Sequence, residues 1–321
     1  MNAQNPTWQT EIRPYGTAAI AEAAEWIGRG QPVAIATETV YGLAGDATSD
    51  SAVARIYAAK GRPSFNPLIV HLPSAEAAAE VADFPPAARL LAKAFWPGPL
   101  TMVLPLLPGA KIAPIVTAGL PTVAIRVPAH PAMQALLAEV GRPLAAPSAN
   151  ASGSISPTTA QHVLASLDGR IPMVIDSGPT RQGIESTIVA IDTDGGARLL
   201  RPGPITPDQI AAVTGQAVYP AGSGKIEAPG QLASHYAPSR PLRLDAVDRR
   251  DGEWLIGFGP VAGDATLSDR GDLVEAAARL FAALHEADLS DCAGIAVAPI
   301  PADGLGLAIN DRLRRAAAPK S

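Results

Sequence analysis

The stretch PVAIATETVYG, residues 32–42, joins a short apolar run to a cluster of hydroxyl and carboxyl side chains. The run from Pro32 to Ala36 is bounded by turn residues, as is typical of a buried strand. Just before it, residues 17–30 place apolar side chains on one helical face and end in a glycine, which indicates a helix. Because ligands of open α/β sheets bind beyond the carboxyl ends of strands, the polar residues after Ala36 either contact a ligand or simply cap the turn.

Helices and strands mix along the rest of the chain, which predicts the α/β class. Their order is not a clean strand–helix repeat, so we expect a mixed, twisted sheet with flanking helices. The predicted helices cover residues 51–60, 74–82, 86–95, 131–140 and 207–213. The predicted strands cover residues 68–72, 100–106, 123–127, 143–146, 172–176, 186–191 and 198–200.

The composition changes after residue 214, which indicates a second domain. Residues 215–241 are rich in Pro, Gly and Ala without a helical or strand period, as is typical of a linker. We therefore expect a first α/β domain at residues 14–214 and a smaller one at residues 242–321. The elements predicted for the smaller domain are strands at residues 242–244, 254–258 and 294–299 and helices at residues 273–285 and 307–317.

Charge and composition exclude several classes of protein. The 321 residues include 30 acidic and 25 basic side chains, a formal net charge of -5, so we expect no strong direct nucleic-acid binding. Cys292 is the single cysteine, which excludes an intrachain disulfide and a Cys-based zinc site. No run approaches the ~20 apolar residues of a membrane span and no signal peptide is visible, so we expect a cytoplasmic protein without membrane contact.

Two cations, Lys60 and Arg62, are separated by one glycine at the end of a predicted helix. An arginine fork and a lysine point charge suit a phosphate ligand. The alternative is an exposed basic helix end, which the helix dipole favours. Asn66 follows in a proline-interrupted turn. His71 ends the next predicted strand, where it is equally well interpreted as a ligand contact or as a half-buried structural histidine.

Further polar residues follow other predicted strands. Arg126 lies in the apolar run TVAIRV, so it has a carboxylate partner, a ligand or solvent. The stretch APSANASGSISPT, residues 146–158, leads into a helix expected to start near Ser156, which is an anion-friendly geometry or a generic serine-rich loop. Arg201 again follows a strand. The sequence contains no Walker P-loop and no HExxH or GxSxG motif, so it indicates no covalent catalysis.

Taken together, KGR at residues 60–62 and SAN at residues 148–150 resemble the paired KxR…SxN signature of the YrdC-type domain. The stretches TETVYGL, NPLIVH, WPGPLT and ESTIV match the same family in order and spacing. Outside that domain, HYAP at residues 235–238 and GLGLAINDRL at residues 304–313 resemble the long, two-domain threonylcarbamoyl-AMP synthases. The resemblance covers nearly the whole chain past Pro14.

The resemblance implies a YrdC-like mixed sheet and a smaller Rossmann-like C-terminal domain. It implies that L-threonine, bicarbonate and ATP, with Mg²⁺, give threonylcarbamoyl-AMP, pyrophosphate and water. The product would pass to a tRNA threonylcarbamoyltransferase for the N6-threonylcarbamoyladenosine modification of tRNA. The resemblance assigns no side chain as a metal ligand, and it places the linker, residues 215–241, over the active site.

The resemblance also implies roles for individual residues. Lys60 and Arg62 would be catalytic, with Lys60 near the reacting phosphate. L-threonine would be bound by Thr39, His71, Arg126, Ala146, Ser186 and Thr187, of which the last two are alternatives. ATP would be bound by Arg62, Asn66, Thr122, Ser148, Asn150, Ser156, Arg201 and Tyr236.

Two other functions compete with this interpretation. The first is an RNA-binding module without turnover, which the acidic charge and the aromatic content of 4% disfavour. The second is carbamoyl transfer in hydrogenase maturation, whose proteins carry an added zinc-finger part that a single cysteine excludes. Within the linker, Tyr236 is either part of a lid that excludes water or an anchor that fixes the orientation of the domains.

Overall fold

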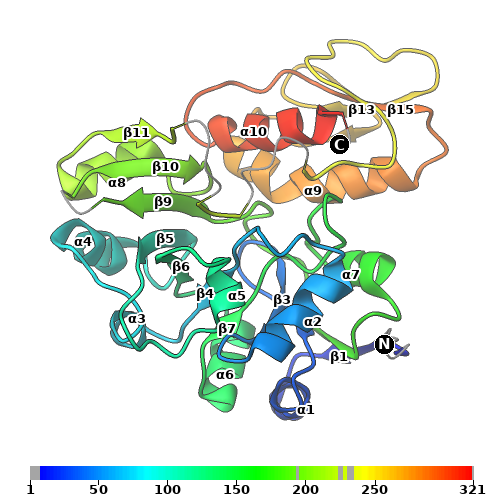
Figure 1. The fold of residues 1–321 in the computed structure, drawn as a ribbon. Coiled ribbons are helices and arrows are strands. Elements are labelled where there is room, and N and C mark those ends of the chain that lie inside the picture. Colours follow the sequence, from blue (N-terminus) through cyan, green and yellow to red (C-terminus); the bar gives the residue numbers. More distant parts are fainter. Residues whose placement is uncertain (1–7, 193–194, 223–226, 230–234, 320–321) are drawn as a thin grey trace.

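The computed structural model describes residues 8–192, 195–222, 227–229 and 235–319 (Figure 1). Its main feature is an 11-stranded sheet in which parallel and antiparallel pairs mix, as predicted. In spatial order the strands are β1 (Glu11–Pro14), β8 (Met173–Asp176), β2 (Val33–Ala36), β3 (Tyr41–Asp46), β7 (Leu144–Ala145), β4 (Ile69–His71), β6 (Thr122–Arg126), β5 (Leu100–Pro105), β9 (Thr187–Ile191), β10 (Ala197–Arg201) and β11 (Val218–Pro220).

Helices cover both faces of this sheet. Side chains alternate along a strand, so Val33 and Ile35 of β2 pack with one group of helices while Ala34 and Ala36 pack with another. The first group is α1 (Thr17–Gly28) and α6 (Pro131–Val140). The second group includes α2 (Asp50–Lys60), α4 (Pro86–Phe95), α5 (Pro114–Thr117), α7 (Ala160–Leu167) and α8 (Pro207–Thr214), and the short α3 (Ala75–Ala79) adds Ala78 to the same core.

The C-terminal unit is a four-stranded parallel sheet with two helices against it. The strand order is β12 (Leu242–Arg243), β15 (Gly294–Val297), β13 (Glu253–Gly257) and β14 (Ala265–Thr266). The helices are α9 (Leu273–Leu289) and α10 (Gly306–Ala317). The sheet is parallel, and α9 forms the connection from β14 to β15, which agrees with the Rossmann-like arrangement that we expected.

One of the apolar clusters contains residues of both units. Val40, Ile155 and Ile184 of the larger unit are buried in the same cluster as Phe281 and Leu284 of α9. Just before Ile184, Gly183 has a positive φ of 68° and passes so close to α9 that a Cβ atom there would lie 2.4 Å from the carbonyl oxygen of Ala278. Only glycine tolerates both this backbone conformation and this approach. The larger unit therefore presents a closely fitted surface to α9.

The structure differs from the sequence-based expectations at several points. The helix expected near Ser156 begins instead at Ala160, because the Thr159 side chain caps it by accepting from the backbone of His162. The start of the predicted linker forms β11, so the large sheet continues past residue 214. Residues 223–226 and 230–234 of that linker lie outside the described residues. The strands β1, β3 and β14 and the helix α5 were not predicted.

Candidate active site

A pocket of about 530 Å³, part of it open to solvent, lies where several strand ends meet the linker. β4 and β6 run parallel, with His71 opposite Arg126 at their carboxyl ends. The other walls are the segments after β2 and β7, before β9 and after β10. The lining residues are Thr37, Thr39, Val40, Gly42, Arg62, Ile69, His71, Arg126, Ala146, Pro147, Ser148, Glu185, Ser186, Arg201, Pro229, His235 and Tyr236.

Arg126 is held by the loop that follows β2. Its Nη1 donates to the hydroxyl of Thr39 at 2.9 Å, and its Nε donates to the carbonyl of Gly98 at 3.2 Å. Its Nη2 lies 2.7 Å from Oε1 of Glu38, close enough for an ion pair but without the alignment of a hydrogen bond. The internal partner considered for Arg126 therefore exists. Nη2 and the Glu38 carboxylate both keep hydrogen-bonding capacity.

The hydroxyls beside this pair are fixed by one another. Thr37 and Thr39 share a hydrogen bond of 2.8 Å, and the Thr37 hydroxyl also donates to the carbonyl of Val40 at 2.7 Å. The capping interpretation of this motif is thus correct for Thr37. Thr39 at the same time faces the pocket and orients Arg126.

Lys60 and Arg62 are both buried, so the alternative of an exposed basic helix end is wrong. Gly61 ends α2 in the left-handed conformation, which turns the chain between the two cations. Burial, together with nearby Arg201, lowers the pKa of Arg62 to about 10, and among the residues that the structure describes its Nε has no hydrogen-bond partner. Arg62 Nη2 donates to the carbonyl of Pro67 at 3.2 Å.

The Lys60 ammonium is turned toward the segment after β7 and does not line the pocket. It donates to the carbonyls of Ser148 and Asn150, each at 2.5 Å. Burial and the neighbouring Arg62 move its pKa well below the usual value. Asn150 also serves the segment, because its amide donates to the carbonyls of Ala151 and Ser154. Lys60 and Asn150 thus hold the serine-rich loop in place.

Asn66 and His71 have buried polar atoms without partners. In the part of the chain that the structure describes, neither polar atom of the Asn66 side-chain amide has a hydrogen-bond partner, although Asn66 is only 1% exposed. His71 is 2% exposed, its Nδ1 is likewise without a partner there, and burial with nearby Arg126 lowers its pKa to about 3. Unpaired buried polar atoms are rare in folded proteins and often mark ligand sites. Because His71 is almost completely buried, its interpretation as a half-buried structural histidine is wrong.

Ser186 and Thr187 point to different sides of β9. The Ser186 hydroxyl lies in the pocket, where it bonds Thr101 at 2.7 Å and accepts from Nη2 of Arg201 at 3.1 Å. Arg201 Nε also donates to the Ser186 carbonyl. The Thr187 hydroxyl instead bonds both backbone groups of Ile205. Ser186 is therefore the one whose side chain is available to a ligand.

Of three other predicted residues, Ser156 and Thr122 lie outside the pocket lining and Ser148 belongs to it. Ser156 is fully buried outside the pocket lining and donates to Glu185 at 2.5 Å. Thr122 begins β6, on the same sheet face as Ala124 and Arg126, and about 13 Å from Arg126 at the usual strand rise. Ser148 lines the pocket directly.

Tyr236 reaches the pocket from the linker. It is 1% exposed, has a positive φ of 64°, and its hydroxyl forms no hydrogen bond with a described residue. The ring packs against Phe281 of α9 with 5.5 Å between centroids. Beside it, burial lowers the pKa of His235 to about 3. Tyr236 thus both faces the pocket and contacts the C-terminal unit, as the lid and anchor interpretations each require.

Polar residues of this site that were not assigned from the sequence include Thr37, Glu38 and Glu185. Thr37 and Glu38 belong to a quoted motif, and Glu185 directly precedes Ser186, so each lies within two residues of an assigned one. The contacts of Thr37 are local, with Thr39 and Val40. The contacts of Glu38 with Arg126 and of Glu185 with Ser156 join segments far apart in the chain, so no local pattern revealed the roles of the two carboxylates.

A pocket at strand ends that contains three buried arginines defines an α/β enzyme that binds an anionic, phosphate-bearing ligand. Comparisons with known proteins support this class. A family model described as "Telomere recombination", for Sua5, YciO and YrdC proteins, matches residues 25–203. A model described as "Threonylcarbamoyl-AMP synthase, C-terminal domain" matches residues 205–318.

Two curated relatives and one solved structure extend the match to both units. The threonylcarbamoyl-AMP synthase of Bacillus subtilis is 42% identical, over 93% of this chain and 92% of its own length. That of Pyrococcus abyssi is 42% identical, over 92% of each. The crystal structure of P. abyssi Sua5 complexed with L-threonine superposes with a TM-score of 0.87 at 39% identity, over 96% of this chain and 98% of that one.

The chain belongs to the threonylcarbamoyl-AMP synthase family. It is an ATP-using transferase that makes threonylcarbamoyl-AMP for tRNA modification. Among the described residues, the structure has no helix with the length and apolar character of a membrane span.

Proposed function

We propose that the enzyme condenses L-threonine, bicarbonate and Mg·ATP in this pocket. The observation that carries the proposal is the imbalance of charge. Arg62 and Arg201 are buried at the pocket wall, and neither forms an ion pair with any residue that the structure describes. A buried cation without a counter-charge is costly, so an anionic ligand such as a triphosphate stabilises the site when it binds.

L-threonine is placed at the Arg126 end of the pocket. The free capacity of Arg126 Nη2 suits the amino-acid carboxylate, and the Thr39 and Ser186 hydroxyls suit its amine and side chain. His71, whose lowered pKa keeps it neutral at physiological pH, offers an unpaired Nδ1. Ala146 is small enough to leave room for the methyl group. The L-threonine bound to P. abyssi Sua5 supports an amino-acid subsite in this family.

The nucleotide extends from this end along the sheet face of β6. Thr122 and Arg126 share that face, and their separation suits a ligand as long as a nucleoside phosphate. The Ser148 hydroxyl lines the pocket, the unpaired amide of Asn66 would bind the nucleotide, and Arg62 and Arg201 take the phosphates. Lys60 acts by holding the loop of residues 148–150 and by its charge.

The chemistry needs positioning more than a protein nucleophile. The threonine amine and bicarbonate form a carbamate and release water. A carbamate oxygen then attacks the α-phosphorus of ATP, the bond to the β-phosphate breaks, and pyrophosphate leaves. Arginines around the pocket neutralise the charge that develops, and the buried pocket walls limit the access of water to the labile carbamate.

Magnesium fits as part of the substrate. Among the described residues there is no cluster of three His, Cys, Asp or Glu side chains that would hold a metal ion. The two nearby carboxylates, Glu38 and Glu185, are already engaged by arginines. Mg²⁺ commonly binds through substrate phosphates with few protein ligands, so the ion would enter with ATP.

The test is product formation by the purified protein. Incubation with radiolabelled bicarbonate, L-threonine, ATP and magnesium should yield a labelled adenylate and pyrophosphate, and omission of any one substrate should abolish both. Transfer of the label to tRNA on addition of a tRNA threonylcarbamoyltransferase would support that downstream partner and a cytoplasmic role. Tight, salt-sensitive RNA binding without adenylate formation would instead favour the RNA-binding alternative.

A further inference from the structure

Arg312 of α10 belongs to the C-terminal unit but lies against the catalytic pocket. It is 0% exposed, although it is among the largest side chains of the protein. All three of its guanidinium nitrogens donate hydrogen bonds. Nε donates to the Glu185 carboxylate at 2.9 Å, Nη1 to the carbonyl of Pro202 at 2.7 Å, and Nη2 to the carbonyl of Glu185 at 3.4 Å.

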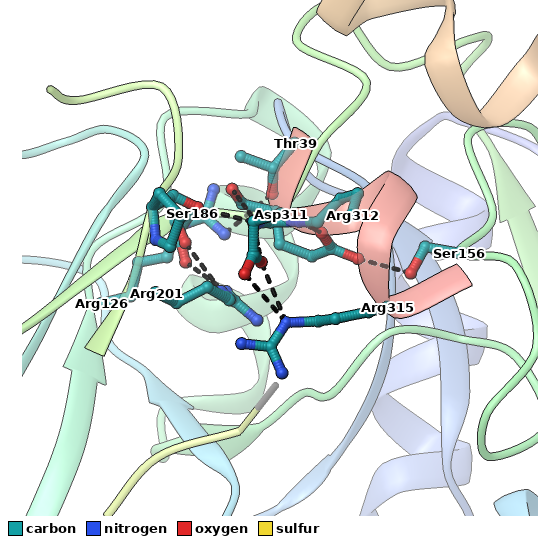
Figure 2. Close-up of polar contacts among 10 residues, drawn as sticks. Thr39, Arg126, Ser156, Ser186, Arg201, Asp311, Arg312 and Arg315 are labelled. Carbon is teal, nitrogen blue, oxygen red and sulfur yellow. Dashed lines mark hydrogen bonds and ion pairs between the residues drawn. The ribbon is translucent and has the colours of Figure 1, made fainter. Parts of the chain in front are cut away.

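These contacts fix both neighbours of a pair that lines the pocket. Glu185 directly precedes Ser186, and Pro202 directly follows Arg201. Ser186 and Arg201 bond each other through both the backbone and the side chain of Ser186. Figure 2 shows Arg312 in one cluster with Ser156, Ser186 and Arg201. One guanidinium from α10 therefore sets the spacing of two segments on whose ends the pocket residues lie.

The same side chain contacts two further groups of the site. The other carboxylate oxygen of Glu185 accepts from Ser156, so this carboxylate is bonded at both oxygens. The Arg312 guanidinium also lies 5.5 Å from the ring centroid of Tyr236, a cation–π distance. Asp311, next to Arg312, pairs with Arg315 one turn further on and so holds the local charges on α10 in place.

We propose that Arg312 is a positioning residue for the reaction, through which the C-terminal unit completes the active site of the larger unit. It acts by holding Glu185 and Pro202, and thereby orients Ser186 and Arg201 toward the substrates. The proposal rests on the substrate-binding roles proposed above for those two residues. A C-terminal unit that merely adds stability needs no buried three-donor contact at the pocket.

The test compares three variants of the full-length enzyme. Arg312→Gln removes the charge and two of the three donor nitrogens. Arg314→Gln removes an exposed arginine of the same helix. Leu255→Ala opens a cavity in a buried cluster that Leu255 forms with Ala246 and Ala296, all of them residues of the C-terminal unit. Turnover, KM for ATP and for L-threonine, and Tm are measured for each, with assays well below the lowest Tm.

We expect Arg312→Gln to lower kcat by about 10-fold or more, because small misplacements of binding groups are costly to catalysis. Leu255→Ala should lower Tm yet keep near-normal kcat, and Arg314→Gln should change neither. If Leu255→Ala and Arg312→Gln lose activity in proportion to their loss of Tm, Arg312 is only structural and the proposal is overturned. If the wild-type protein makes no threonylcarbamoyl-AMP, it is the proposed function that fails.

The pH profile supplies a readout that a structural role would not move. Burial opposes ionisation of Glu185, but Arg312 and Arg201 outweigh it and lower its pKa. The other titratable groups that act on Glu185 are Lys60, His235 and Tyr236. In Arg312→Gln the pKa of Glu185 should rise, so the acid limb of the kcat profile should move to higher pH. An unmoved acid limb with wild-type kcat would overturn the proposal.

Arg312→Lys keeps the test decisive if the glutamine variant does not fold. The lysine retains the positive charge beside Glu185, so the acid limb should stay near that of the wild type. A single ammonium cannot reproduce the planar fork that bonds Glu185 and Pro202 together, so kcat should still fall. Wild-type kcat in Arg312→Lys would show that the fork is not needed and would refute positioning by Arg312.

Discussion

Glu38 and Arg126 face each other 2.7 Å apart, between Oε1 and Nη2, where both side chains are almost fully buried. Burial would raise the pKa of Glu38, but the guanidinium of Arg126 outweighs it, and the pKa is lowered. A carboxylate with a lowered pKa stabilises the fold at pH values above its unfolded pKa. That contribution is lost as the pH falls through the folded-state pKa.

Glu38→Gln should therefore lower the free energy of unfolding by about 3 kcal/mol at neutral pH, because Arg126 loses its buried counter-charge. The stability of the variant should also depend less on pH below about 4.5 than that of the wild type. Urea unfolding at neutral pH and in acid measures both effects. The control is Glu25→Gln, whose exposed pair with Arg29 should contribute below about 1 kcal/mol.

Arg62→Ala should lower kcat by roughly 10²-fold, the effect of removing one electrostatic stabiliser. Stability should change little, because Arg62 forms no ion pair with a described residue and burial already lowers its pKa. Steady-state rates and Tm test this, with exposed Lys111→Ala as the control for lost charge. Retention of normal kcat would remove Arg62 from the mechanism.

Lys60→Met should behave differently from Arg62→Ala, since its ammonium bonds the carbonyls of Ser148 and Asn150. Leaving two carbonyls unpaired in a buried loop costs roughly 1–3 kcal/mol each. We expect a clear fall in Tm together with lower activity. If activity falls with Tm unchanged, Lys60 acts on the substrate directly and not through the loop.

Asn66→Ala separates binding from stability. The Asn66 side-chain amide forms no hydrogen bond with any residue that the structure describes, so its removal should leave Tm within a few degrees. If ATP supplies the missing partners, KM for ATP should rise about 10-fold, the equivalent of one hydrogen bond of roughly 1.4 kcal/mol. The matched control is Asn150→Ala, which loses two intramolecular hydrogen bonds and should lower Tm.

Tyr236→Phe distinguishes the hydroxyl from the ring. The ring contacts with Phe281 and Arg312 would persist, so domain packing and Tm should stay close to those of the wild type. The buried hydroxyl has no partner among the described residues, so its loss should affect substrate binding alone. Tyr236→Ala, in contrast, should lower both Tm and activity. Unchanged KM values in Tyr236→Phe would show that the hydroxyl does not contact the substrates and that Tyr236 only fixes the orientation of the domains.

The elements predictable from the sequence were those with local signals. The predicted bounds at residues 86–95 and 131–140 match α4 and α6, because each helix starts with a proline and carries an apolar face. β3, in contrast, has no alternation to reveal it, since every residue from Tyr41 to Asp46 is buried. A fully buried strand that contains two glycines is hard to distinguish from a loop.

The candidate site was predictable at its motifs but not in its contacts. Thr39, Arg62, His71, Arg126, Ser148, Ser186 and Arg201 were selected from loops and strand ends, and all line one pocket. The partners Glu38 for Arg126 and Arg312 for Glu185 were not assigned. The second pair is separated by 127 residues, and only the folded chain brings such residues together.

The packing of the two units requires that residue 183 have no Cβ atom. A methyl group at this position would collide with the backbone carbonyls of Ala277 and Ala278, which are part of a helix and cannot rotate away. A YrdC-type unit with any larger residue there could not accept α9 in this position, however well its remaining surface matched. If the two units were exchanged between relatives, they would therefore pack together only where the larger unit has glycine at this position.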